Sequence, residues 1–322
     1  MRSRLRDLKL NQMKVTDKML DMKHILKLII IIPAVLSFLA SCKEVYVTYS
    51  DAEYVMFADT AAFYPVQEDV EYFKIPVVST VKCNYDRTFA VEILDKGSNA
   101  IENVHYTLAS NTVTIKAGET RSDVLVHGIY DSFEAEDSLG FTLSLVMPDQ
   151  LEMPLYGRQT KATLVKCCPF DINDFTGWCM FTSMFLYEYS VTGSYQRLIK
   201  TKIDPNAPDT IICENWLKDG YDLRICFDTE DPMKPLVSVE AGQIVSDEGS
   251  FFGIIHGDDR IRVRTSPYYD SLFYPCGSYL TIATEMYVEN IGTPVGTVGH
   301  YYNIMEWVSD EEADRLKREE GM

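Results

Sequence analysis

Short runs of alternating apolar and polar residues cover the first half of the chain. In residues 87–94 the apolar side chains Phe89, Val91 and Ile93 stand at every second position. A period of two is typical of a strand with one buried face. Further β-rich runs separated by turn residues lie at residues 53–57, 72–78, 112–115, 122–127 and 141–146. Short strands at regular spacing, without a long amphipathic helix, predict a β-sandwich over residues 53–166.

A second series of β-rich runs follows Pro169, which ends the preceding strand. The strands it predicts are 178–189, 196–203, 210–214, 221–228, 236–241, 249–256, 260–265 and 279–288. Residues 256–260, His-Gly-Asp-Asp-Arg, are typical of a hairpin turn. Hairpin succession predicts an antiparallel β-meander, open or closed as a barrel, over residues 167–308. The predicted fold class is therefore all-β.

Residues 309–322 form a charged tail. Ser309 followed by Glu312 is a capping-box pattern, which predicts a short helix over residues 313–320. The spacing also predicts ion pairs four residues apart, Glu311 with Arg315 and Asp314 with Arg318.

The N-terminal part has a different pattern, in which basic residues from Lys23 precede an apolar run that only Pro33 and Ser37 interrupt. The run covers residues 28–40 and is followed by Ser41 and Cys42. This order is typical of a secretory signal, and the run is shorter than the roughly 20 residues that cross a bilayer. It resembles a bacterial lipoprotein signal, which implies lipid on Cys42. We expect residues 1–41 to be absent from the mature protein and residues 42–52 to form the anchor and tether. The long polar and basic stretch before the signal favours a translation start at Met22, and a genuine N-terminal extension is the alternative.

Charge excludes one class of partner. The chain carries 30 basic and 48 acidic residues, and residues 1–41 contain eight of the former and three of the latter, so the remainder has a net charge near −23. Such a body repels nucleic acid, and no nucleic-acid partner is expected. The expected partners are instead the membrane, through the lipid on Cys42, a polysaccharide, or an outer-membrane transporter.

The cysteines leave the redox state open. Besides Cys42 the chain has seven, an odd number: Cys83, Cys167, Cys168, Cys179, Cys213, Cys226 and Cys276. Buried free thiols are the favoured interpretation, and one or two disulfides are the alternative. Spacing alone does not give the connectivity.

Landmarks in the first domain resemble the Calx-β sandwich, in the version found in uncharacterised Bacteroidetes surface lipoproteins. They are residues 84–93, 105–106, 114–120, 131–137 and 141–145. The resemblance implies an immunoglobulin-like sandwich that acts as a spacer or interaction module. Calx-β domains of sodium–calcium exchangers bind calcium through acidic loops. The matching loop here contains Asp131, Glu134, Glu136 and Asp137. Oxygen ligands suit calcium, but the expectation is that no cofactor binds and that this is a solvated turn.

The opening of the second domain, Asp174-Phe-Thr-Gly-Trp178, resembles the lipocalin-like C-terminal domains of the same lipoproteins. The lipocalin Gly-x-Trp pattern is absent, because Gly177 and Trp178 are adjacent. A barrel of this kind either holds a ligand or is filled by its own side chains. The resemblance implies an outer-membrane lipoprotein on the cell surface or the periplasmic face.

Aromatic side chains in loops are the candidate ligand contacts, because ring faces stack on the apolar faces of sugars. The aromatic candidates are Trp178, Trp216, Tyr268, Tyr269, Tyr301, Tyr302 and Trp307. Trp216 is the first choice, with Asn215 beside it, and Tyr268 and Tyr269 come next, with Asp270 beside them. The alternative for each is ordinary packing.

Enzyme signatures are absent from the sequence, which contains no HExxH, GxSxG or phosphate-binding loop. The sequence therefore predicts a non-catalytic, lipid-anchored binding protein that captures glycans for outer-membrane uptake. One alternative is a structural or adhesion lipoprotein that binds a protein partner. A glycoside-active enzyme is the second alternative.

Overall fold

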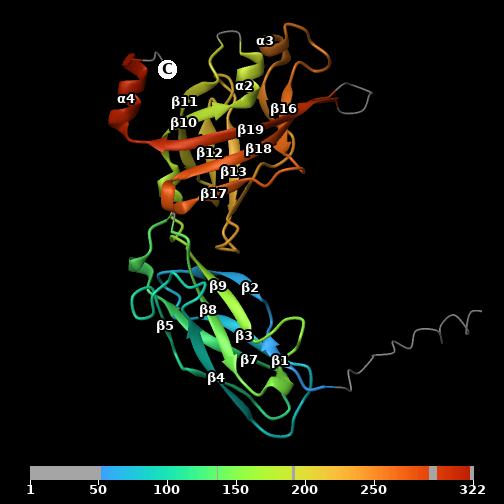
Figure 1. The fold of residues 1–322 in the computed structure, drawn as a ribbon. Coiled ribbons are helices and arrows are strands. Elements are labelled where there is room, and N and C mark those ends of the chain that lie inside the picture. Colours follow the sequence, from blue (N-terminus) through green and yellow to red (C-terminus); the bar gives the residue numbers. More distant parts are fainter. Residues whose placement is uncertain (1–51, 136, 191–192, 290–295, 320–322) are drawn as a thin grey trace, which may run out of the picture. The chain divides into compact units, whose positions relative to one another are not determined.

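The computed structural model describes residues 52–319 except residues 136, 191–192 and 290–295 (Figure 1). The predicted signal and the lipid site at Cys42 lie outside the described residues. Strands dominate the described chain, and the prediction of an all-β fold is confirmed.

Nine strands form a sandwich of two sheets, with orders β1-β3-β7-β5 and β2-β9-β8-β4-β6. The strands are β1 Val55–Phe57, β2 Ala61–Val66, β3 Phe73–Ser79, β4 Arg87–Leu94, β5 Tyr106–Leu108, β6 Thr112–Ile115, β7 Arg121–Gly128, β8 Leu139–Val146 and β9 Gln159–Lys166. Strands β2 and β9 pair in parallel. Only the short 3-10 helices η1 Tyr130–Ser132 and η2 Asp149–Leu151 interrupt the described strands of this part.

The sandwich core forms because alternate residues of each strand face the opposite sheet. In β4, Phe89 and Val91 are buried while the residues between them are exposed, as the alternation predicted. Aromatic stacks connect the two sheets. The rings of Tyr106 and Phe141 have centroids 4.0 Å apart, and those of Tyr64 and Phe73 are 5.0 Å apart.

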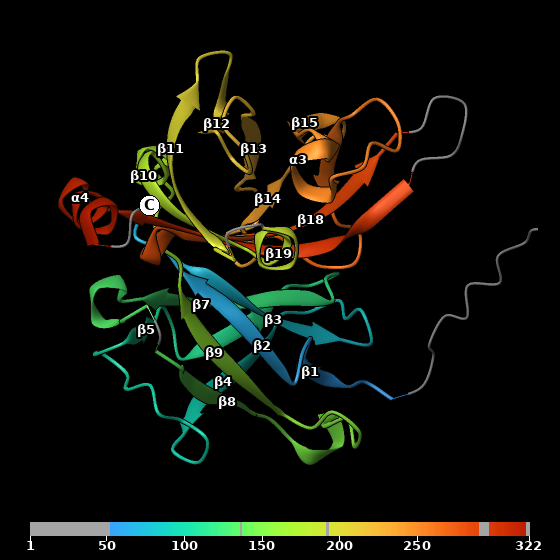
Figure 2. The same cartoon turned by 90° about the horizontal axis from the view of Figure 1, so that it is seen from above.

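The second half of the chain forms a closed barrel. Its strands are β10 Gly177–Ser183, β11 Gln196–Asp204, β12 Ala207–Glu214, β13 Leu223–Asp228, β14 Leu236–Ser238, β17 Leu272–Tyr274, β18 Tyr279–Val288 and β19 Gly296–Val308. Each pairs with its neighbour, and the β18–β19 pairing closes the circle (Figure 2). Two further strands, β15 Gln243–Ser246 and β16 Ile261–Thr265, join through β18.

Side chains fill the interior of the barrel. Phe181, Trp216, Phe273, Ile282 and Met305 are each at most 1% exposed and belong to one apolar cluster. Of the two arrangements left open by the sequence, the structure therefore has the packed interior and not a ligand-holding calyx.

Two predicted strands in this half are wrong in part or in whole. The predicted strand 178–189 ends at Ser183, where the Ser183 side chain caps helix α2 (Met184–Tyr189). The predicted strand 249–256 and its hairpin are replaced by helix α3 (Glu248–Phe252), which Asp247 caps and which ends at Gly253 with φ of 67°. Strands β15, β17 and β19 were not predicted.

The C-terminal helix α4 (Asp310–Glu319) confirms the capping prediction, because the Glu312 backbone N–H donates to Ser309 Oγ at 3.2 Å. The predicted ion pairs are wrong. Arg315 pairs with Glu312 and Glu319 instead, and Lys317 pairs with Asp314. The helix is docked, since Ala313 and Leu316 are buried.

One disulfide joins Cys168 to Cys276, across 108 residues of sequence. Cys168 lies four residues before the 3-10 helix η3 (Ile172–Phe175) that leads into the barrel, and Cys276 lies in η4 (Pro275–Gly277). The remaining described cysteines are free, and Cys179 and Cys213 among them are buried. Both interpretations of the cysteines therefore apply, each to different residues.

Candidate functional site

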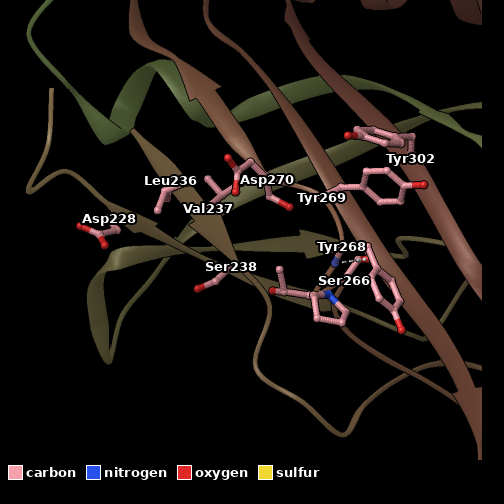
Figure 3. A pocket seen from close by; sticks show the side chains of 12 residues that line it. Asp228, Leu236, Val237, Ser238, Ser266, Tyr268, Tyr269, Asp270 and Tyr302 are labelled. Atoms are coloured by element: carbon pink, nitrogen blue, oxygen red, sulfur yellow. Dashed lines mark hydrogen bonds between the residues drawn. The ribbon is translucent and has the colours of Figure 1, made fainter. Parts of the chain in front are cut away.

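A hollow of about 550 Å³ lies on the outside of the barrel and brings together four separate stretches of chain. Its walls come from the end of β13 at Asp228, from β14, from the loop 266–271 between β16 and β17, and from Tyr302 of β19 (Figure 3). The volume falls within the range of about 300–1,000 Å³ that is usual for small-molecule sites.

Three tyrosines supply the aromatic surface of the hollow. Tyr268 is 72% exposed, Tyr269 51% and Tyr302 43%. The Tyr269 and Tyr302 rings have centroids 5.2 Å apart and are tilted by 55°, and Tyr268 meets the His300 ring edge-on at 4.8 Å. Tyr268 and Tyr269, which follow one another in the loop, thus contact His300 and Tyr302 of β19. These two positions of β19 are two residues apart and share one face of the strand.

Buried hydroxyls hold the loop in this position. Ser266 is 3% exposed, and its Oγ lies 3.0 Å from His300 Nδ1 and accepts the Tyr268 backbone N–H at 3.3 Å. At the other end of the loop, Ser271 Oγ accepts the Ala283 backbone N–H at 3.0 Å. Because both ends are fixed to β18 and β19, the intervening tyrosines are preorganised rather than free to collapse onto each other.

The polar groups of the hollow include two carboxylates, Asp228 at the end of β13 and Asp270 in the loop before β17. Asp270 forms an ion pair with Lys234, whose Nζ lies 3.0 Å from Asp270 Oδ2. Asp228 accepts the Glu230 backbone N–H at 3.0 Å with its Oδ1. Ionised carboxylates accept hydrogen bonds and donate none, so this hollow is chemically suited to a ligand rich in hydroxyl donors.

The prediction for Trp216 is wrong. It lies in the loop between β12 and β13, as expected, but the loop folds inward and Trp216 is fully buried, with its ring centroid 4.9 Å from that of Phe181. Asn215 supports the loop instead of a ligand, since its Oδ1 accepts the Gly220 backbone N–H at 2.7 Å. The loop follows Glu214, at the opposite end of the β12–β13 hairpin from Asp228, so it does not join the hollow.

Three other aromatic candidates have structural contacts. Tyr301 is buried. The indole N–H of Trp307 donates to Thr201 Oγ1 at 2.8 Å. Trp178 lies beneath the ammonium groups of Lys200 and Lys317, which are 4.6 and 3.6 Å from its ring centroid. The cation–π contact of Lys317 attaches helix α4 to the barrel.

The acidic loop of the sandwich begins with Asp131 in η1 and continues after that helix. Asp131, Glu134 and Asp137 are exposed, and Asp137 Oδ2 accepts the Glu134 backbone N–H at 2.8 Å, which closes a turn. Glu136 lies outside the described residues. Within the described residues no three His, Cys, Asp or Glu side chains are grouped as metal ligands would be. The solvated turn expected at this loop and its alternative, a calcium site, both stay predictions.

Sequence reasoning found Tyr268, Tyr269, Tyr302 and Asp270, but it missed Asp228, Lys234 and His300. Two residues of β19, His300 and Tyr302, are separated by one position, which is a signal that they share a face. No comparable signal placed Asp228 beside Asp270, because their proximity depends on the order of strands around the barrel.

The sequence of residues 155–319, which includes the whole hollow, matches a domain of unknown function, DUF4984. The chain belongs to the DUF4984 family. No curated protein matches it. In the described residues of this DUF4984 chain, no helix is long and apolar enough to cross a membrane.

Several solved structures resemble this DUF4984 chain. A Bacteroides ovatus protein of unknown function is 11% identical, with a TM-score of 0.33 over 79% of this chain and 94% of that protein. An auxiliary nutrient binding protein from Bacteroides thetaiotaomicron is 15% identical, with a TM-score of 0.27 over 77% and 90%. The apo-form Calx CBD1 domain is 16% identical, with a TM-score of 0.29 over 36% and 98%.

Proposed function

We propose that this protein is a non-catalytic glycan-binding lipoprotein of the cell envelope, and that its binding site is the hollow around Tyr268, Tyr269 and Tyr302. The observation that carries the proposal is the exposure of these three tyrosines within one hollow that also contains two carboxylates. Ring faces suit the apolar faces of sugars, and carboxylates suit their hydroxyl groups.

The cellular part of the proposal rests on the sequence. The apolar run before Cys42 is typical of a secretory signal, and one or more acyl chains on Cys42 would hold the body at a membrane. In this account the protein captures polysaccharide beside an outer-membrane transporter. A Cys42→Ser variant should move from the membrane fraction to the soluble fraction of cells, whereas an unchanged distribution would contradict lipidation.

Glycan binding is tested with the chain that starts at residue 42 and carries Cys42→Ser, which retains every described strand and helix. We expect its migration in native gels to be retarded by at least one polysaccharide and the retardation to be lost in Tyr269→Ala. Release of reducing ends from the same polysaccharide is measured in parallel, and hydrolysis would favour the enzyme alternative.

A protein partner is the second candidate function. It is favoured by Leu155 and Tyr156, which are 76% and 50% exposed side by side in the loop between β8 and β9 of the sandwich. Exposed neighbouring apolar side chains can anchor a protein interface. Crosslinking on intact cells, lost in Leu155→Ser with Tyr156→Ser and kept in Tyr269→Ala, would support this candidate.

A further inference from the structure

The charges around the hollow indicate which glycans it accepts, an inference that rests on the proposed function. Two carboxylates line the hollow, Asp228 and Asp270, and no lysine, arginine or histidine is among the described lining residues. Lys234 contacts the lining from outside it, and its ammonium group is paired with Asp270 at 3.0 Å. The surface that a ligand meets is therefore negative.

Both carboxylates keep an acceptor for a ligand. Asp270 uses Oδ2 for Lys234, and Asp228 uses Oδ1 for the Glu230 backbone N–H. In the described part of the chain, the second oxygen of each has no bonded partner that would block a sugar hydroxyl. The lining hydroxyls Thr265 and Ser266 are bonded to neighbouring groups, and Asp228 and Asp270 are the charged acceptors among the described lining residues.

We infer that the hollow selects uncharged glycans and rejects glycans that carry carboxylate or sulfate groups, and that Asp270 enforces this by masking Lys234. A ligand anion would meet two fixed negative charges. Repulsion between like charges disfavours such a ligand. Without the Asp270 carboxylate, Lys234 would become an unpaired cation at the rim, which is the group that an anionic glycan needs.

The test uses matched polysaccharide pairs that share one backbone: hydroxyethylcellulose with carboxymethylcellulose, dextran with dextran sulfate, and laminarin with sulfated laminarin. The proteins are the chain from residue 42 with Cys42→Ser, its Asp270→Asn variant, and Asp270→Asn combined with Lys234→Met. Asparagine keeps the shape of aspartate, and the combined variant removes the exposed cation. Asp270→Asn raises the total charge of the protein by one, and Lys234→Met lowers it by one. General repulsion between the protein and a polyanion therefore stays comparable among the three proteins.

We expect the unmodified protein to be retarded by a neutral member of a pair and not by its anionic partner. Asp270→Asn should weaken neutral binding about fivefold to tenfold, since a charged acceptor becomes a neutral one. It should also gain retardation by the anionic partner, and Lys234→Met should abolish that gain.

The outcomes separate the two proposals. Equal binding of both members of a pair by the unmodified protein would leave glycan capture standing and overturn charge selection. If Asp270→Asn gains no anionic binding while its neutral binding persists, glycan capture stands and the masking of Lys234 by Asp270 is overturned. Retardation by no polysaccharide would overturn glycan capture and the selection with it. Circular dichroism and thermal melts of the variants exclude misfolding as the cause of any loss.

Discussion

The rings of Tyr269 and Tyr302 lie with their centroids 5.2 Å apart, although one belongs to the loop 266–271 and the other to the last strand, β19. Tyr302 pairs in register with Ala283 of β18, and the loop is tied to Ala283 by hydrogen bonds to its backbone N–H and C=O. The aromatic surface therefore depends on the pairing that closes the barrel. Any ligand contact made by these rings uses residues that are assembled only in the folded protein.

Removal of one ring should weaken binding without unfolding the barrel. We expect Tyr269→Ala and Tyr302→Ala each to lower the affinity for a bound polysaccharide about tenfold, because each removes one stacking face. Affinity electrophoresis over a series of polysaccharide concentrations measures this. Tyr187→Ala is the matched control, since Tyr187 is 68% exposed on α2 outside the hollow lining. Equal losses in the control and the site variants would argue against the hollow.

Trp216 should affect stability and not affinity. It is fully buried against Phe181, so Trp216→Ala should lower the free energy of unfolding by about 3–5 kcal/mol through the cavity it creates. Urea denaturation followed by circular dichroism measures the change. Trp216→Phe keeps much of the volume and should cost less. A Trp216→Ala protein of normal stability that has lost polysaccharide binding would contradict the assignment of Trp216 to the core.

The Cys168–Cys276 disulfide should stabilise the barrel, because it closes a long loop in the unfolded chain. Replacing both cysteines by alanine should lower the free energy of unfolding by about 2–5 kcal/mol. Cys226→Ala, which removes a free and partly buried thiol, is the control and should have a small effect. If the double variant unfolds at the same urea concentration as the unmodified protein, the bridge contributes nothing to stability.

Acid should remove a stabilising contact between the β12–β13 loop and α3. The Lys218 ammonium and the Ser250 hydroxyl lower the pKa of Asp247 from its ordinary value to about 2. A carboxyl whose pKa is lower in the folded state stabilises the fold above its unfolded pKa of about 3.9, and this contribution is lost as the pH falls toward 2. The unmodified protein should therefore lose stability over this interval.

The Lys218→Met variant tests the contribution of this contact. It should be less stable than the unmodified protein at pH 7, and the difference should shrink between pH 4 and pH 2. Lys202→Met is the control, because Lys202 pairs with Glu214 and does not contact Asp247. Thermal midpoints recorded at closely spaced pH values measure both. A stability difference between Lys218→Met and the unmodified protein that is constant from pH 7 to pH 2 would contradict the assignment.

The strands that could be predicted are those with strong alternation or a long β-branched run. Residues 87–94 and 279–288 coincide with β4 and β18. The strand predicted over residues 249–256 was wrong, although the length of this stretch and its Phe-Phe and Ile-Ile pairs are typical of a strand. The competing signal was local: Asp247 caps the helix and Gly253 ends it, six positions later.

The site could be predicted only in part. Tyr268, Tyr269 and Asp270 follow one another in a loop after Pro267, so polarity and turn chemistry were sufficient to propose them. Trp216 had the same kind of polar surroundings, but the adjacent Leu217 is also buried, and both belong to the apolar cluster of the barrel. Whether a loop folds over a core or away from it depends on tertiary packing, which the local sequence does not contain.

The most direct measurement is isothermal titration of the chain from residue 42, carrying Cys42→Ser, with oligosaccharides of the polysaccharide that retards it most strongly. We expect saturable binding, with an affinity that Tyr269→Ala lowers about tenfold and Tyr187→Ala leaves unchanged. Binding that survives removal of both Tyr268 and Tyr269, or the absence of any saccharide that binds, would contradict glycan capture at this hollow.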